Sequence, residues 1–266
     1  MRRLFVLALT AALFGAPTIS LAQNVAGAQQ IESWSQAKVI AMGREIYRQD
    51  RAAWLATDAL LAALSQAELA DVRGWIVVPT STGDLVRFLA ADDAGVRARW
   101  DIIVGVDSAG PVVAAPSPDL SADEIGRWTA RQTAIANMSS LRCGPKMNSV
   151  VARDPDSDGW IVWLLTATTE SGVIPLGGHQ RFRISADGRT VLSRENLSVG
   201  CLNMQPPAEA DEGAIVFVTH LVSDGPVETH IFLSIQNQIP IAVGVKDRVF
   251  IVLGDQIEEH TMPEAP

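Results

Sequence analysis

Apolar residues at a helical period mark the first structured segment of the chain. Seven of them fall close to one helix face and predict a helix over residues 31–64: Ile31, Trp34, Met42, Ile46, Trp54, Leu61 and Leu64. Ser33 and Gln36 have the spacing of a capping box, and a break near Gln49-Asp50 would divide this segment into two helices. Ser65 and Glu68 predict one further helical turn.

After Gly74 the apolar period changes to two, which is typical of β-strands. Residues 75–79, 85–89 and 99–106 therefore indicate three short strands, and turns rich in Gly, Asp and Ser separate them. Pro116-Ser117-Pro118 is the strongest candidate for a linker.

A second helix is expected over residues 121–139, where Ser121 and Glu124 are spaced as a capping box. Strand character then recurs in eight segments: 149–152, 159–168, 178–185, 190–193, 215–222, 229–235, 241–245 and 249–253. Sequential strands joined by tight turns form antiparallel meanders. The sequence therefore predicts an α+β fold, with an N-terminal helical segment and a second helix packed on an antiparallel β-meander sheet.

The first 22 residues have the pattern of a cleaved signal peptide. Arg2 and Arg3 precede an apolar run over residues 4–14, and Ser20-Leu21-Ala22 places small residues where signal peptidase requires them. We expect cleavage after Ala22 and a periplasmic location. The alternative, an uncleaved membrane anchor, is disfavoured because the run is too short to span ~30 Å of hydrocarbon.

The expected mature chain divides into two further parts. Residues 23–118 combine the helical segment with the small three-stranded meander, and residues 119–260 combine a helix with antiparallel sheet; the two can also form one domain. Gly-Trp-Ile-Val occurs at Gly74 and again at Gly159. A duplicated unit and a chance match between two buried strands both remain open.

The net charge excludes one class of partner, and the two cysteines predict a disulfide. The 266 residues carry a formal net charge of −9, and loss of Arg2 and Arg3 changes it to −9 − 2 = −11. Such a chain repels phosphate backbones, so we expect no nucleic acid as partner. No later stretch has the length and apolarity of a transmembrane helix, so we expect no stable membrane insertion after signal cleavage. Cys143 and Cys201 are expected to form a disulfide, worth about 4 kcal/mol in the chain-entropy model. A redox pair is the alternative, although such pairs are normally close in sequence.

Two motifs suggest chemistry but fail a closer check. Ser108 lies in a sequence like that around the nucleophile of trypsin-like proteases. In those proteases the catalytic histidine precedes the serine, whereas all four histidines of this chain follow Ser108. A hairpin turn is therefore the preferred interpretation of this segment. Asp154, Asp156 and Asp158 match the first half of a calcium loop, but Leu165 occupies the position that requires a bidentate Glu. A solvated turn is preferred, and a looser calcium-binding turn is the alternative.

Three histidines form the candidate metal site. A hairpin symmetric about Gly225 would place His220 and His230 opposite each other, with Cβ atoms about 5 Å apart. His179 on another strand would supply a third ligand, as in catalytic zinc sites. Glu228, expected on the same face as His230, would orient a ring or act as a base. The alternatives are half-buried structural histidines or a pH-sensing pair.

Four stretches together resemble a group of uncharacterised exported proteins of Gram-negative bacteria: residues 44–54, Gly177-Gly178-His179, residues 185–189 and Val218-Thr219-His220-Leu221. The resemblance implies export but no activity, cofactor or catalytic residue.

The sequence favours a non-enzymatic periplasmic binding module for a protein or small ligand. The alternative is a metal-dependent hydrolase or lyase in which His179, His220 and His230 hold zinc.

Overall fold

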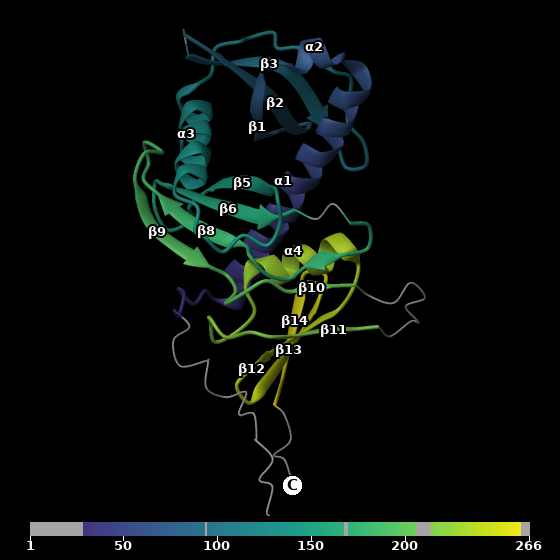
Figure 1. Ribbon diagram of the computed structural model, residues 1–266, viewed down its shortest axis with the longest axis vertical. Coiled ribbons are helices and arrows are strands. Elements are labelled where there is room, and N and C mark those ends of the chain that lie inside the picture. Colours follow the sequence, from purple (N-terminus) through teal and green to yellow (C-terminus); the bar gives the residue numbers. More distant parts are fainter. Residues whose placement is uncertain (1–28, 94, 168–169, 206–213, 262–266) are drawn as a thin grey trace, which may run out of the picture.

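The computed structural model describes residues 29–93, 95–167, 170–205 and 214–261 (Figure 1). Within these ranges the chain forms four helices and several β-sheets, most of whose strand pairs are antiparallel, so the α+β prediction is confirmed. None of the helices in the described part of the chain combines the length and apolarity needed to cross a bilayer. The predicted signal peptide, residues 1–22, lies outside the described residues.

The first helix, α1, spans Gln36–Ala63 and is continuous. The predicted start and the predicted break at Gln49-Asp50 are both wrong. Ser35, not Ser33, caps the helix, because its side chain accepts a hydrogen bond from the Lys38 amide. The residues before Ser35 are not helical, and the Ile31 amide donates to the Val222 carbonyl 2.9 Å away.

The first sheet covers the C-terminal half of α1. It comprises β1 (Val72–Thr80), β2 (Gly83–Asp92), β3 (Gly95–Val104) and β4 (Val113–Ala114), antiparallel and in that order. Small side chains on the helix, including Ala52 and Ala56, pack against Val86 and Ile102 of the sheet and allow a close approach. The short helix α2 (Gln66–Leu69) has the predicted Ser65–Glu68 capping box.

The second helix and sheet lie in the middle of the molecule. Helix α3 (Ala122–Ala136) begins at the predicted Ser121–Glu124 capping box. It packs on an antiparallel sheet of β5 (Met147–Arg153), β6 (Trp160–Thr166), β8 (Gln180–Ile184) and β9 (Val191–Asn196), in that order. Two short strands, β7 (Ile174–Pro175) and β10 (Asn203–Met204), pair beside it.

The last sheet departs from the predicted meander. It comprises β11 (Val216–Thr219), β12 (Ile241–Val245), β13 (Arg248–Leu253) and β14 (Gln256–Thr261). Strand β11 pairs parallel with β12, and helix α4 (Glu228–Asn237) connects them. The strand predicted at 229–235 is therefore wrong. Residues 228–234 are all buried, so this helix lacks the polar face that reveals a 3.6-residue period.

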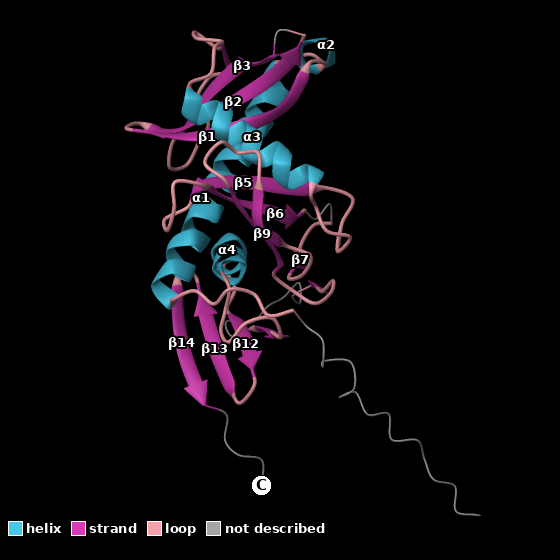
Figure 2. Cartoon of the chain, turned by 90° about the vertical axis from the view of Figure 1, so that its left-hand side faces the viewer, coloured by secondary structure: helices cyan, strands magenta, loops and turns pink. Residues whose placement is uncertain are grey.

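Helix α1 connects these layers. It contacts the first sheet, β5 and α4, and Figure 2 shows α4 lying between α1 and strands β12–β14. Gly43 is at the helix crossing, where an added Cβ would lie 2.4 Å from the Cβ of Ile231. The division predicted at residue 118 stays a prediction.

Candidate functional site

His220 and His230 meet, but not through a hairpin. His220 directly follows β11, and His230 lies in the first turn of α4. Their ring centroids are 5.0 Å apart at an interplanar angle of 82°, and both residues are buried. The predicted hairpin about Gly225 is wrong, because the chain enters a helix after Val227.

The hydrogen bonds of the histidines argue against a zinc site. His230 Nδ1 accepts from the Val227 amide at 3.0 Å, and His179 Nδ1 accepts from the Thr166 amide at 3.1 Å. A neutral ring that accepts at Nδ1 carries its proton on Nε2, so neither ring offers a metal a free lone pair. His179 Nε2 donates to the Pro175 carbonyl at 2.8 Å.

His220 is the exception, since its buried Nε2 has no hydrogen-bond partner among the described residues. No group of three or more His, Cys, Asp or Glu side chains in the described ranges has an arrangement that could hold a metal ion. The geometry therefore does not support a zinc centre of His179, His220 and His230, nor the hydrolase or lyase based on it.

Burial also keeps these rings neutral. It lowers the pKa of His179 and of His220 to about 4. The pKa of His230 lies well below its usual value, first because of burial and then because of charge on the neighbouring histidines. At neutral pH the three histidines are uncharged core residues.

Glu228 has a structural partner rather than the predicted role beside His230. Its carboxylate is fully buried, pairs with Arg181 Nη1 at 3.1 Å and accepts from Trp163 Nε1 at 2.8 Å. Arg181 also donates to Glu195 at 2.7 Å and lies 3.8 Å from the ring centroid of Trp34. This network connects α4, the middle sheet and the segment before α1.

The acidic turn predicted from Asp154 to Asp158 also has its hydrogen-bond and ion-pair partners within the protein. Asp154 accepts from the Asp156 amide at 3.0 Å and from Ser157 Oγ at 2.9 Å. Arg183 lies within ion-pair distance of Asp154 and Asp156, and Lys38 pairs with Asp156. The carboxylates of Asp154 and Asp156 are therefore engaged by cations of the protein itself, which favours the turn without calcium.

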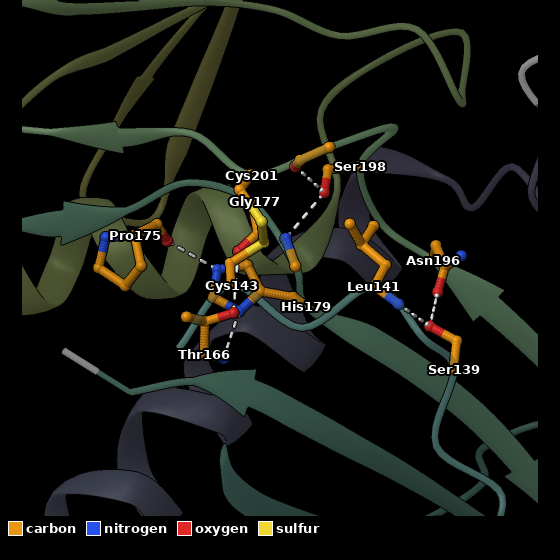
Figure 3. The surroundings of a disulfide bond; sticks show 12 residues. Ser139, Leu141, Cys143, Thr166, Pro175, Gly177, His179, Asn196, Ser198 and Cys201 are labelled. Atoms are coloured by element: carbon orange, nitrogen blue, oxygen red, sulfur yellow. Dashed lines mark hydrogen bonds between the residues drawn. A yellow bond between two sulfur atoms is a disulfide. The ribbon is translucent and has the colours of Figure 1, made fainter. Parts of the chain in front are cut away.

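The predicted disulfide between Cys143 and Cys201 is present, with an S–S distance of 2.10 Å (Figure 3). Gly178 packs directly against it: its φ is +81°, and an added Cβ would lie 2.4 Å from Cys143 Sγ. Thr166 Oγ1 donates to the Gly177 carbonyl at 2.9 Å. The Gly177-Gly178-His179 stretch thus holds the disulfide and β6 together.

A pocket of about 350 Å³ lies between α1 and one end of the first sheet. Its wall is mainly apolar and comprises residues of α1, the start of β2 and the end of β3: Tyr47, Arg48, Arg51, Ala52, Gly83, Asp84, Val104, Gly105 and Val106. Gly83 permits the close approach of β2, because a Cβ there would lie 2.4 Å from the Val104 carbonyl oxygen.

The loop after β3 forms one rim of this pocket. Gly105 donates to the Ser108 carbonyl at 3.0 Å, so Ser108 lies in a tight exposed turn. Val106 and the Asp107 side chain beside it are 84% and 94% exposed. An exposed apolar residue at the mouth of a partly apolar pocket is suited to cover a bound molecule.

Sequence reasoning missed this pocket. Tyr47 and Arg51 have the i, i+4 spacing that places them on one face of a helix, and this was a usable signal. The pattern does not say which loop approaches that face. Val104–Val106 come from a strand end more than fifty residues later, and only the folded sheet places them there.

Comparison of the chain with protein-family models, curated proteins and solved structures gives no match.

Proposed function

We propose that this protein is an exported, periplasmic, non-enzymatic binding module that takes up a small ligand in the pocket between α1 and the first sheet. One observation carries the proposal. The pocket volume, about 350 Å³, falls within the range of about 300–1,000 Å³ that is typical of small-molecule sites. Its largely apolar wall with a few converging polar groups also fits such a site.

Two sequence features support the exported location. The first 22 residues have the order of charged, apolar and small residues that signal peptidase recognises. The chain also places its two cysteines in a disulfide, which persists in oxidising compartments. Expression with residues 1–22 and N-terminal sequencing of periplasmic material tests this part, and an N-terminus at Gln23 is expected.

A pocket-filling variant tests the binding site. Gly105 lines the pocket, and an added Cβ there meets its closest atom, the Ser108 carbonyl oxygen, at 3.9 Å. Gly105→Phe is therefore expected to fold normally and to occupy the pocket. Gly200→Phe is the matched control, because a Cβ at Gly200 meets no atom within 4 Å.

Native mass spectrometry of periplasmic protein, followed by a thermal-shift screen of small molecules, identifies bound ligands. Ligand binding should be lost in Gly105→Phe and kept in Gly200→Phe. If both variants bind like the natural chain, or if both lose binding, the pocket is not the site and the proposal fails.

A further inference from the structure

We infer that the ligand of this pocket is an amphiphilic monocarboxylate, whose carboxylate binds Arg51 and whose apolar body lies against Val104 and Val106. The inference rests on the proposed function and adds the chemical class of the ligand. The two arginines of the pocket wall differ in how closely they are paired with carboxylates.

Arg48 is fully engaged. Its Nε and Nη2 donate to the two carboxylate oxygens of Glu45 at 2.9 and 2.6 Å, and its Nη1 pairs with Asp84. Such a bidentate pair uses the directional donors of a guanidinium. Arg48 also neutralises Asp84, so the carboxylate in the pocket wall is unsuited to recruit a cationic ligand.

The N–H donors of Arg51 form no hydrogen bond within the described chain. Among the described residues its guanidinium forms one ion pair, with Asp107, and the 3.8 Å separation exceeds a hydrogen-bond distance. The Arg51 side chain is 26% exposed. A carboxylate that reached it would form the bidentate pair it lacks.

Asp107 forms only a weak ion pair with Arg51. Its side chain is 94% exposed, and exposed ion pairs of this kind contribute about 0–1 kcal/mol. A ligand carboxylate therefore displaces it at little cost. The group is expected to carry one negative charge, because Arg48 is already paired with Glu45 and Asp84 and, among the described residues of the wall, Arg51 is the one cation left to balance it.

The apolar wall defines the other end of the ligand. Val106 is 84% exposed on the rim, and Ala52 and Val104 lie behind it. Covering Val106 removes apolar surface from water, and this favours a hydrocarbon chain or ring attached to the carboxylate. The Tyr47 side chain, also in the wall, adds an aromatic surface for the same group.

Octanoate and octanamide are the matched probes, since they differ in charge and share the hydrocarbon chain. Isothermal titration should show octanoate binding at least about tenfold more tightly than octanamide, the ratio expected for a charge-assisted pair. Arg51→Gln should abolish this preference, and Asp107→Asn should tighten octanoate binding several-fold. Arg44→Gln, on an exposed part of the same helix, should leave both probes unchanged.

Equal binding of the two probes, a preference that survives Arg51→Gln, or no binding of octanoate at millimolar concentration would each overturn the inference. These outcomes differ from failure of the proposed function. A neutral molecule that binds the natural chain and not Gly105→Phe would keep the pocket as the binding site and exclude only the carboxylate class.

Discussion

His220 and His230 lie edge to face, with ring centroids 5.0 Å apart, although one follows a strand and the other begins a helix. Val227 holds the second ring by donating its amide hydrogen to Nδ1. The first ring keeps a buried Nε2 with no partner among the described residues. Protonation of these two buried rings therefore destabilises the folded state.

We expect acid to destabilise the protein below pH 6.5. An unfolded histidine has a pKa of about 6.5, and burial lowers the pKa of His179 and His220 to about 4. Between these values the unfolded chain binds more protons, so the free energy of unfolding falls as the pH falls. The loss is on the order of 3 kcal/mol for each histidine. Urea unfolding at pH 7.5 and pH 4.5 measures it.

His220→Leu separates this contribution from that of the carboxylates. Because Nε2 of His220 has no partner within the described chain, replacement by Leu at pH 7.5 should change stability by less than about 1 kcal/mol. The difference in stability between pH 7.5 and pH 4.5 should shrink in this variant. An unchanged difference would show that His220 does not drive the acid effect.

Glu228→Gln should destabilise the fold strongly. The change leaves Arg181, which is 1% exposed, without its fully buried counter-charge, and breaking such a pair costs about 3 kcal/mol. Chemical denaturation measures the loss. The double variant Arg181→Met with Glu228→Gln should recover part of it, because no charge of this pair is then left buried. Additive losses would contradict this account.

Gly178→Ala should be costlier than an ordinary substitution at a left-handed glycine. Both Gly178 and Gly172 have positive φ, +81° and +74°, but only at Gly178 would a Cβ collide with the disulfide. Gly172→Ala therefore measures the backbone cost alone, about 1 kcal/mol. We expect Gly178→Ala to lower the melting temperature further, and equal shifts for both variants would refute the steric explanation.

Asp50→Asn should stabilise the protein at neutral pH. Asp50 is half-buried and accepts from Asn148 at 3.1 Å; burial raises the pKa of its carboxyl to about 6. The folded state thus resists ionisation, and stability falls as the pH rises from about 4 to 6. At pH 7.5 the variant should gain about 1–2 kcal/mol, and at pH 3.5 the gain should vanish. A gain that persists at pH 3.5 would exclude this cause.

Local signals predicted much of the fold. The capping boxes at Ser65 and Ser121 are present, and alternating apolar residues identified three of the four strands of the first sheet, β1, β2 and β3. Helix α4 escaped prediction because residues 228–234 are buried on every side, polar ones included, so burial and polarity do not follow a 3.6-residue pattern there.

The candidate site was less accessible to sequence reasoning. His220 and His230 were expected to be neighbours and are, but the predicted cause, a hairpin, is wrong. Hydrogen bonds from the Val227 and Thr166 amides, which decide whether a ring can bind metal, depend on how the start of α4 and the end of β6 meet these rings in the fold. Sequence spacing carries no information about them.

The contacts of the N-terminal segment affect how the chain reaches its native state. Gln30 and Ile31 bind the carbonyls of Leu221 and Val222, and Gly43 of α1 packs against Ile231 of α4. Contacts of such long sequence separation raise contact order and slow folding. A nascent chain emerging from its N-terminus therefore presents α1 long before its partner helix exists, and the part of α1 around Gly43 stays uncovered until α4 has been synthesised.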